Sequence, residues 1–165
     1  MKTITKGLLL GLMLFAGARA EAQTKKDDIP VAELPAPVKD VLEQYVKLLR
    51  AGPNVEACAK ALIPIAGGGL VNPEGTGLRQ DVPRFALKKD FDNVKFYADP
   101  LEITRVNKGT TGGHGFGKSA IKGPVYKIWI AKKKGGAGMP APISIMVPEG
   151  HPTITTPRVV VIGSL

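Results

Sequence analysis

The stretch "TGGHGFGKSA" holds the residues of this chain whose types and spacing match a phosphate-binding pattern. Residues Gly112 to Ser119 satisfy G-x-x-x-x-G-K-[ST]. In a phosphate loop, backbone N–H groups surround the phosphates, the lysine contacts them, and a helix begins at the Lys-Ser pair. The chemistry would then be the binding or hydrolysis of a nucleotide.

The surroundings of this stretch do not fit a phosphate loop. The segment before it, "LEITRVNKGTT", is half polar, and Gly123-Pro124 would break a helix within about one turn. The apolar segment "RVVVIGSL" carries no acid that could hold magnesium. Glycine-rich stretches match this loose pattern by chance, and the chain has 20 glycines. We therefore predict no nucleotide, no cofactor, and a long flexible hairpin connection over 108–123.

The other reactive side chains form no recognisable arrangement. His114 and His151 are far apart in sequence and lack metal-ligand spacing. Ser119 has no visible His-Asp partners. Asp90 and Asp92 are two residues apart, so on a helix they do not share a face. The sequence predicts no catalytic residue and no metal site.

The first 22 residues, "MKTITKGLLLGLMLFAGARAEA", are typical of a secretory signal peptide. Lys2 and Lys6 precede an uncharged, mostly apolar run, and small residues at Ala18, Ala20 and Ala22 offer cleavage sites. The run is too short to span a bilayer, which takes about 20 residues. We predict an exported protein, periplasmic or secreted, with no transmembrane segment in the mature chain.

Composition narrows the class further. The length of 165 residues suits one domain. The net charge of +9 predicts a basic surface. A basic surface attracts polyanions or is simply solvated, and both interpretations stay open. The single cysteine, Cys58, excludes an intrachain disulfide.

Periodicity predicts helices in the first half of the chain. Residues 23–37 contain three prolines and are expected to form a tether. A helical stripe follows, with apolar residues spaced at i, i+3, i+4, i+7, i+8 and i+11: Val38, Val41, Leu42, Tyr45, Val46 and Leu49. Gly52-Pro53 ends this helix, and Asn54 is a good N-cap for a second helix that ends at Pro64. A third, short helix is expected over 82–92.

The second half reads as antiparallel strands. Alternation and β-branched content predict strands at 101–107, 124–133, 141–147 and 157–165. Lys132-Lys133-Lys134 followed by Gly135-Gly136 is typical of a hairpin tip. The order of elements predicts an α+β fold, with N-terminal helices on an antiparallel sheet of four or more strands.

This order resembles the nuclear-transport-factor-2-like (cystatin-like α+β) superfamily. The resemblance covers 38–165 as a single domain and rests on "PVKDVLEQYVKLL", "NVEACAKAL", "RFALKKDFDNVKF" and the strands that follow. It implies a curved sheet wrapped around the helices as a cone, often with an apolar cavity. Members commonly dimerise through the open sheet face, so a homodimer is expected from the same resemblance.

The resemblance also implies which residues would bind a ligand. An apolar cavity would be lined by aromatic side chains of the helical segments and the central strand: Tyr45, Phe85, Phe91, Tyr97 and Trp129. The alternative for each of them is plain core packing, which a domain with 5% aromatic residues needs. The first hypothesis is an exported, non-catalytic domain that binds a small apolar ligand or a protein partner. The alternatives are a cavity enzyme of isomerase or dehydratase type, which needs a buried acid or histidine, and a polyanion binder, which needs its lysines on one face.

Overall fold

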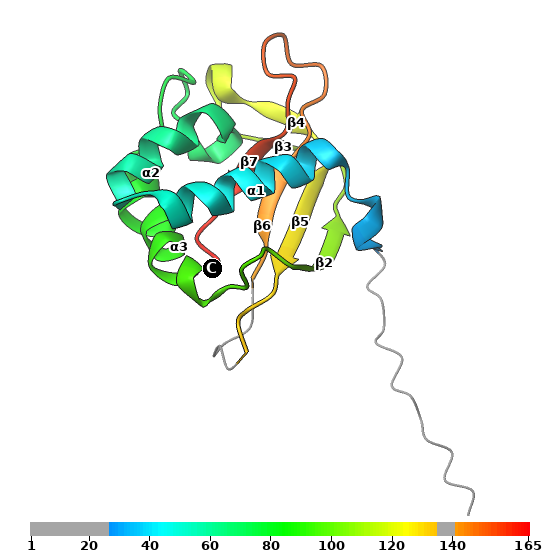
Figure 1. The fold of residues 1–165 in the computed structure, drawn as a ribbon. Helices are drawn as coiled ribbons and strands as arrows, with labels where there is room; N and C mark the ends of the chain where they lie inside the picture. The colour runs from blue at the N-terminus through cyan, green and yellow to red at the C-terminus, as the bar shows by residue number, and fades with distance from the viewer. Residues whose placement is uncertain (1–26, 135–140) are drawn as a thin grey trace, which may run out of the picture.

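The computed structural model of the chain describes residues 27–134 and 141–165, and it confirms the α+β class (Figure 1). The predicted signal peptide and the glycines of the predicted hairpin tip lie outside the described residues. Three α-helices precede most of the sheet: α1 (Ala36–Ala51), α2 (Val55–Leu62) and α3 (Leu87–Asn93). A five-stranded antiparallel sheet has the order β1-β2-β5-β6-β7: Asp28–Ile29, Ile103–Lys108, Val125–Ile130, Ile143–Met146 and Arg158–Val161. A separate hairpin pairs β3 (Gly112–His114) with β4 (Ile121–Gly123).

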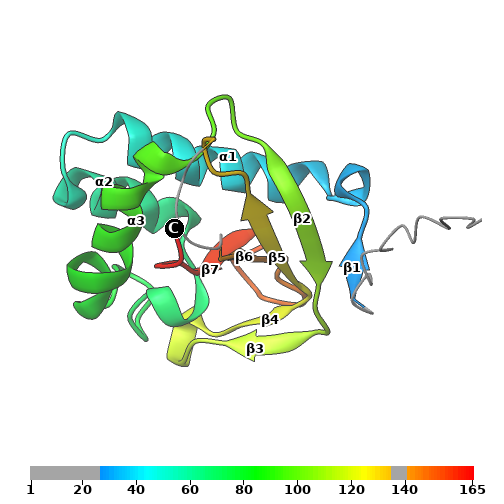
Figure 2. The same ribbon diagram turned by 90° about the horizontal axis from the view of Figure 1, so that it is seen from below.

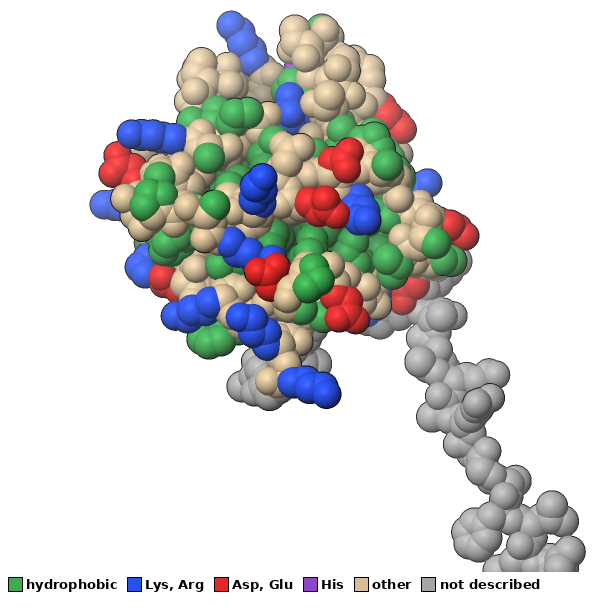
Figure 3. Space-filling model, in the orientation of Figure 1, with side chains coloured by type: hydrophobic (Ala, Val, Ile, Leu, Met, Phe, Trp, Pro, Cys, Tyr) green, Lys and Arg blue, Asp and Glu red, His purple; other side chains and the backbone are tan. Residues whose placement is uncertain are grey.

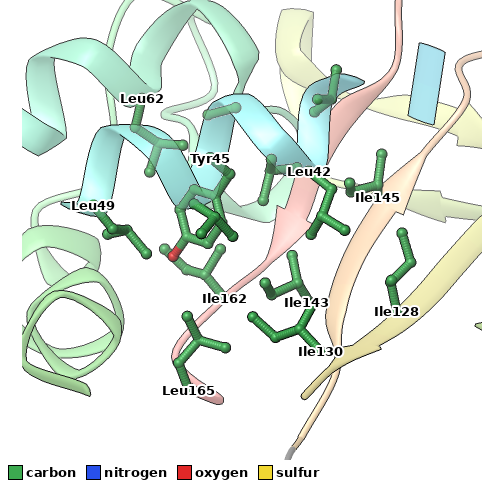
Figure 4. Close-up of a cluster of buried hydrophobic side chains, with 14 of the residues drawn as sticks. Leu42, Tyr45, Leu49, Leu62, Ile128, Ile130, Ile143, Ile145, Ile162 and Leu165 are labelled. Atoms are coloured by element: carbon green, nitrogen blue, oxygen red, sulfur yellow. The ribbon is translucent and has the colours of Figure 1, made fainter. Parts of the chain in front are cut away.

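Helix α1 forms on the predicted stripe and crosses one face of the sheet, which we call the inner face (Figures 1 and 2). All six residues of the stripe are buried. They meet the inward side chains of the strands, among them Ile128, Ile130, Ile143 and Ile145, in one apolar cluster (Figure 4). Apolar burial of this kind is worth about 25 cal/mol per Å2 and is the main source of stability for the domain. Protein side chains fill the space between helix and sheet.

The second helix begins as predicted. The side chain of Asn54 accepts a hydrogen bond of 2.9 Å from the N–H of Ala57, which satisfies a backbone donor at the helix start. Cys58 is buried, and its thiol donates to the carbonyl oxygen of Leu48 at 3.2 Å. Burial raises the pKa of Cys58. The cysteine is therefore a packed core residue.

The third helix is longer and less regular than the prediction. A π-helical turn over Val82–Ala86 leads into α3, and a 3-10 turn over Val94–Phe96 follows it. The chain then pairs with the end of β5, because the N–H of Ala98 donates to the carbonyl of Ala131 and the N–H of Lys133 donates to that of Phe96. This pairing places the exit of α3 beside the lysines that follow β5.

The four predicted strands are present, and they run antiparallel. The sheet is open, so the cone that the resemblance implied is not closed. The predicted tether enters the domain: β1 adds a fifth strand beside β2, and Leu34 is buried in the main core. Backbone pairing at the sheet edge and one apolar side chain explain why the fold begins before residue 38.

The predicted hairpin connection over 108–123 contains a short antiparallel hairpin, β3-β4. It packs on the outer face of the sheet, on the side away from α1 (Figure 2). Ile121 belongs to a second apolar cluster there, with Val125, Met146 and Val160. The sheet is thus covered on both faces at this end of the molecule, which we call the hairpin end.

Candidate functional site

The glycine-rich stretch forms tight turns and close backbone contacts at the hairpin end. Gly115 has a φ of +85°, and a side chain there would lie 2.7 Å from the backbone of Gly68. Gly117 has a φ of +60°, and a side chain there would lie 2.6 Å from the carbonyl oxygen of Pro73. The Lys-Ser pair sits in a 3-10 turn followed by β4, where a phosphate loop would begin a helix. These glycines serve left-handed turns and close backbone contact.

Two histidines line one pocket at this end, which the sequence did not predict. His114 and His151 line a pocket of about 330 Å3 together with Lys122 and Glu149. Nδ1 of His151 accepts hydrogen bonds from the N–H groups of Thr153 and Ile154, so the ring holds its own loop. Within the described residues, no three His, Cys, Asp or Glu side chains are placed to hold a metal ion together.

The structure places the five residues proposed for ligand contact in different parts of the domain. Trp129 lies on the outer face, because its neighbours Ile128 and Ile130 point into the main core. The guanidinium carbon of Arg105 lies 4.5 Å from the centre of the Trp129 ring, and Arg105 is itself ion-paired with Asp28. This ring is therefore covered by a cation.

Phe85 and Phe91 also lie apart from any common site. Phe85 is 72% exposed on the π-helical turn. Phe91 is partly buried and packs against the main core. Neither lines the pocket described below.

Tyr45 and Tyr97, by contrast, are linked through a buried acid. Asp90 is fully buried and accepts a 2.7 Å hydrogen bond from the Tyr45 hydroxyl. It also accepts 2.8 Å bonds from the N–H groups of Gly163 and Leu165. In Figure 4 the Tyr45 hydroxyl points away from α1, toward the side where Leu165 lies. Asp90 thus joins α1, α3 and the last residues of the chain.

The sequence analysis missed Asp90, although a signal was present. Leu87, Asp90 and Val94 are all buried, at a spacing of three and four residues along one helical face. An acid on an apolar stripe is unusual, since a buried carboxylate needs several donors. Asp92, by contrast, is exposed and pairs with Lys88 at 2.6 Å.

The two tyrosines differ in their hydrogen bonding. Burial raises the pKa of Tyr45 well above its usual value, and the charge and hydrogen bond of Asp90 add to the effect. Burial also raises the pKa of Tyr97, with a further contribution from the charge of Asp90. Both phenols are therefore protonated at neutral pH. The Tyr97 hydroxyl, however, is buried and has no hydrogen-bond partner among the described residues.

Tyr97 lines a pocket of about 340 Å3 beside the end of the chain. We call it the Tyr97 pocket, and its lining residues are Asn93, Phe96, Tyr97, Lys132 and Leu165. The Lys132 ammonium lies 5.5 Å from the centre of the Tyr97 ring. Asn93 donates a 3.0 Å hydrogen bond from Nδ2 to the carbonyl oxygen of Leu165, which fixes that wall. The pocket combines aromatic surface with hydrogen-bond donors.

Lysines are concentrated in the elements that contribute to this pocket, and we call the region the basic end. It comprises α3, the 3-10 turn after it and the residues after β5, with Lys88, Lys89, Lys95 and Lys132–Lys134. Figure 3 shows Lys and Arg side chains gathered over the lower left of the molecule, where Figure 1 places α3. Lys118 and Lys122 are in the hairpin at the opposite end. The lysines that a polyanion binder would use are thus divided between two ends.

Comparisons with protein families, curated proteins and solved structures found no match to this chain. Membership of the nuclear-transport-factor-2-like superfamily, export, and dimerisation through the sheet face remain predictions of the sequence. None of the helices within residues 27–134 and 141–165 has the length and apolar character needed to cross a membrane.

Proposed function

We propose that this chain is a non-catalytic binding domain that takes a small ligand in the Tyr97 pocket. The observation that carries the proposal is the buried Tyr97 hydroxyl, which lacks a partner among the described residues. Leaving a buried donor unsatisfied costs about 1–3 kcal/mol. Native proteins keep few such groups, so each one calls for an explanation. A ligand that offers an acceptor to this hydroxyl would recover that free energy.

The size and lining of the pocket support a small ligand. Ligand pockets typically measure about 300–1,000 Å3 and combine apolar walls with a few polar groups. The Tyr97 pocket, at about 340 Å3, lies at the lower end of that range. Phe96 is 49% exposed and offers an aromatic surface at its edge. A compact molecule with one flat apolar part would suit these walls.

The geometry of Asp90 supports binding over catalysis. A general acid or base must reach the atom whose proton it moves. The oxygens of Asp90 already accept from Tyr45, Gly163 and Leu165. We therefore assign Asp90 and Tyr45 to holding the pocket wall.

The test replaces Tyr97 with phenylalanine and follows two quantities. We expect Tyr97→Phe to raise the free energy of unfolding by about 1 kcal/mol in urea titrations, because the unsatisfied hydroxyl is removed. We also expect it to weaken the binding of small aromatic fragments, followed by amide chemical shifts of Asn93, Phe96 and Lys132. Opposite effects on stability and binding would distinguish a binding group from a purely structural one.

Tyr126→Phe is the matched control. Tyr126 is also largely buried in the main core, with the Lys108 ammonium 5.9 Å from its ring centre, but it does not line the Tyr97 pocket. It should leave fragment binding unchanged. Fragments that leave the three reporter residues unmoved, or a Tyr97→Phe protein that binds them as well as the wild type, would contradict the proposal.

The lysines of the basic end favour a second candidate function, the binding of a polyanion. Six lysines lie there, and of the acids in the same elements Asp90 is buried and Asp92 is ion-paired with Lys88. Binding of this type weakens steeply with salt and is shared among many lysines. Retention on immobilised heparin that falls with salt, and that Tyr97→Phe does not change, would favour this candidate.

A further inference from the structure

His151 lies in the loop between β6 and β7 (147–157, the β6–β7 loop), and its two ring nitrogens make different hydrogen bonds. Nδ1 accepts from the backbone N–H groups of Thr153 at 3.2 Å and Ile154 at 2.9 Å. An imidazole nitrogen that accepts hydrogen bonds carries no proton. The ring proton is therefore on Nε2, which lies 3.3 Å from the carbonyl oxygen of Lys118 in the hairpin and donates to it.

These bonds fit the neutral ring of His151 and not its protonated form. In a protonated histidine both ring nitrogens are donors. A proton on Nδ1 would point at the N–H groups of Thr153 and Ile154, which are themselves donors, so both bonds would be lost. The bond from Nε2 to the Lys118 carbonyl would stay, because that nitrogen is a donor in either form. Protonation would therefore free the loop at Thr153 and Ile154.

The charged and titratable groups near the ring come from the hairpin and from the loop itself. His114 of β3, Lys122 of β4 and Glu149 of the loop line the pocket of about 330 Å3 that His151 also lines. Lys118 carries an exposed side chain on the turn between β3 and β4. None of these groups forms an ion pair with His151 within 4 Å in the described part of the chain. The hydrogen bonds of Nδ1 are thus the contacts that protonation changes most directly.

The loss of these bonds would affect only part of the loop. The N–H of Glu149 donates to the carbonyl of Lys122 at 2.7 Å, which fixes the first part of the loop to β4 independently of the ring. Ile154 packs against the second apolar cluster, on the outer face of the sheet. Movement of Thr153 and Ile154 would therefore uncover apolar surface and open the pocket wall that contains His151.

We propose that His151 is a pH switch. The neutral ring holds Thr153 and Ile154 in place, and the transfer of a proton from water to Nδ1 releases them and opens the pocket at the hairpin end. Histidine is the side chain whose ordinary change of charge falls between about pH 5 and pH 8. The switch lies at the opposite end of the molecule from the Tyr97 pocket and needs no ligand there, so it is independent of the proposed function.

Amide hydrogen exchange at pH 7.5 and pH 5 tests the switch. Protection of each amide is expressed relative to its intrinsic exchange rate at the same pH. We expect Thr153 and Ile154 to lose about tenfold in protection at pH 5, because each amide loses its acceptor. The amide of Glu149 should stay protected, since its acceptor is a backbone carbonyl. Equal protection of Thr153 and Ile154 at the two pH values would overturn the proposal.

Two variants reproduce the two states of the switch without titration. In His151→Asn, Oδ1 replaces Nδ1 as an acceptor that does not take up a proton in this pH range. The chain already contains such a contact, because Oδ1 of Asn54 accepts from the N–H of Ala57, three residues later, which is also the spacing of His151 and Ile154. His151→Asn should keep the protection at both pH values, and His151→Ala should lack it at both.

His114→Gln is the matched control, because His114 is the other histidine of the chain and lines the same pocket. This variant should keep the full response to pH. If His114→Gln abolishes the response, or if His151→Asn responds as the wild type does, the proposal is wrong. A His151→Ala protein with both amides protected at pH 7.5 would equally overturn it, since the ring would then not hold the loop.

Discussion

The hairpin end and the basic end of this molecule differ in how their notable residues are bonded and packed. At the hairpin end, Gly115 and Gly117 of the phosphate-loop pattern allow close backbone contact, and His151 nearby holds its own loop. At the basic end, the sequence shows no motif, yet the Tyr97 hydroxyl is left without a partner among the described residues. The comparison is why we place the candidate site at an unsatisfied group and not at a matched sequence pattern.

We expect the largest loss of stability when Asp90, the acid behind the Tyr97 pocket, is removed. Asp90→Ala would leave the Tyr45 hydroxyl and the N–H groups of Gly163 and Leu165 buried without an acceptor. Each lost partner costs about 1–3 kcal/mol, so we expect a loss of roughly 3–5 kcal/mol in the free energy of unfolding. Urea titration followed by circular dichroism measures it. A loss below about 1 kcal/mol would show that Asp90 does not hold this end together.

A smaller effect is expected from a methyl group in the hairpin. Gly115→Ala would bring Cβ to 2.7 Å from the backbone of Gly68 at a φ of +85°. Backbone strain of this kind costs of order 1–3 kcal/mol. Gly113→Ala is the matched control, because nothing lies within 4 Å of its Cβ position. Thermal unfolding of both variants would test the contrast, and equal melting temperatures would mean that the hairpin is not tightly packed.

The smallest effect is a dependence of stability on alkaline pH. Since the pKa of Tyr45 is raised in the folded state, the folded protein keeps a proton that the unfolded chain loses above about pH 10. Stability should therefore fall as pH rises through this range, by up to about 1.4 kcal/mol per pH unit for one such tyrosine.

The Tyr45→Phe variant isolates this contribution. Other groups titrate equally in both proteins, so urea titrations between pH 8 and pH 11 should give a shallower slope for the variant than for the wild type. Identical slopes in the two proteins would mean that Tyr45 does not contribute to the pH dependence of stability.

The sequence predicted the elements whose signals are local. The stripe from Val38 to Leu49 and the cap at Asn54 each depend on residues within a few positions, and both have the expected structure. The four longer strands were predicted for the same reason. The addition of β1 to the sheet was not predicted, because its partner β2 is remote in the sequence. Asp28 of β1 and Arg105 of β2, which are hydrogen-bonded, are 77 residues apart.

The candidate site was much less predictable. Of the five aromatic residues proposed, only Tyr97 lines the pocket. Tyr97 is singled out because its buried hydroxyl has no hydrogen-bond partner among the described residues. The lack of a partner depends on the fold and cannot be predicted from residue types. Lys132 reaches the pocket through a pairing of its backbone with Tyr97, which depends on how the end of β5 meets the exit of α3. Asp90 needs donors that lie more than 70 residues away in the sequence.

The bonds between Asp90 and the last residues of the chain also bear on how the protein is made. Gly163 is added to the growing chain 73 residues after Asp90, which takes roughly 4–15 s at a typical rate of synthesis. A chain shortened to residue 162 should therefore be about as unstable as Asp90→Ala in the same urea titration, and a stable shortened chain would contradict this. Closing the core around Asp90 thus requires residues 163–165, which are synthesised after every helix and strand of the described fold.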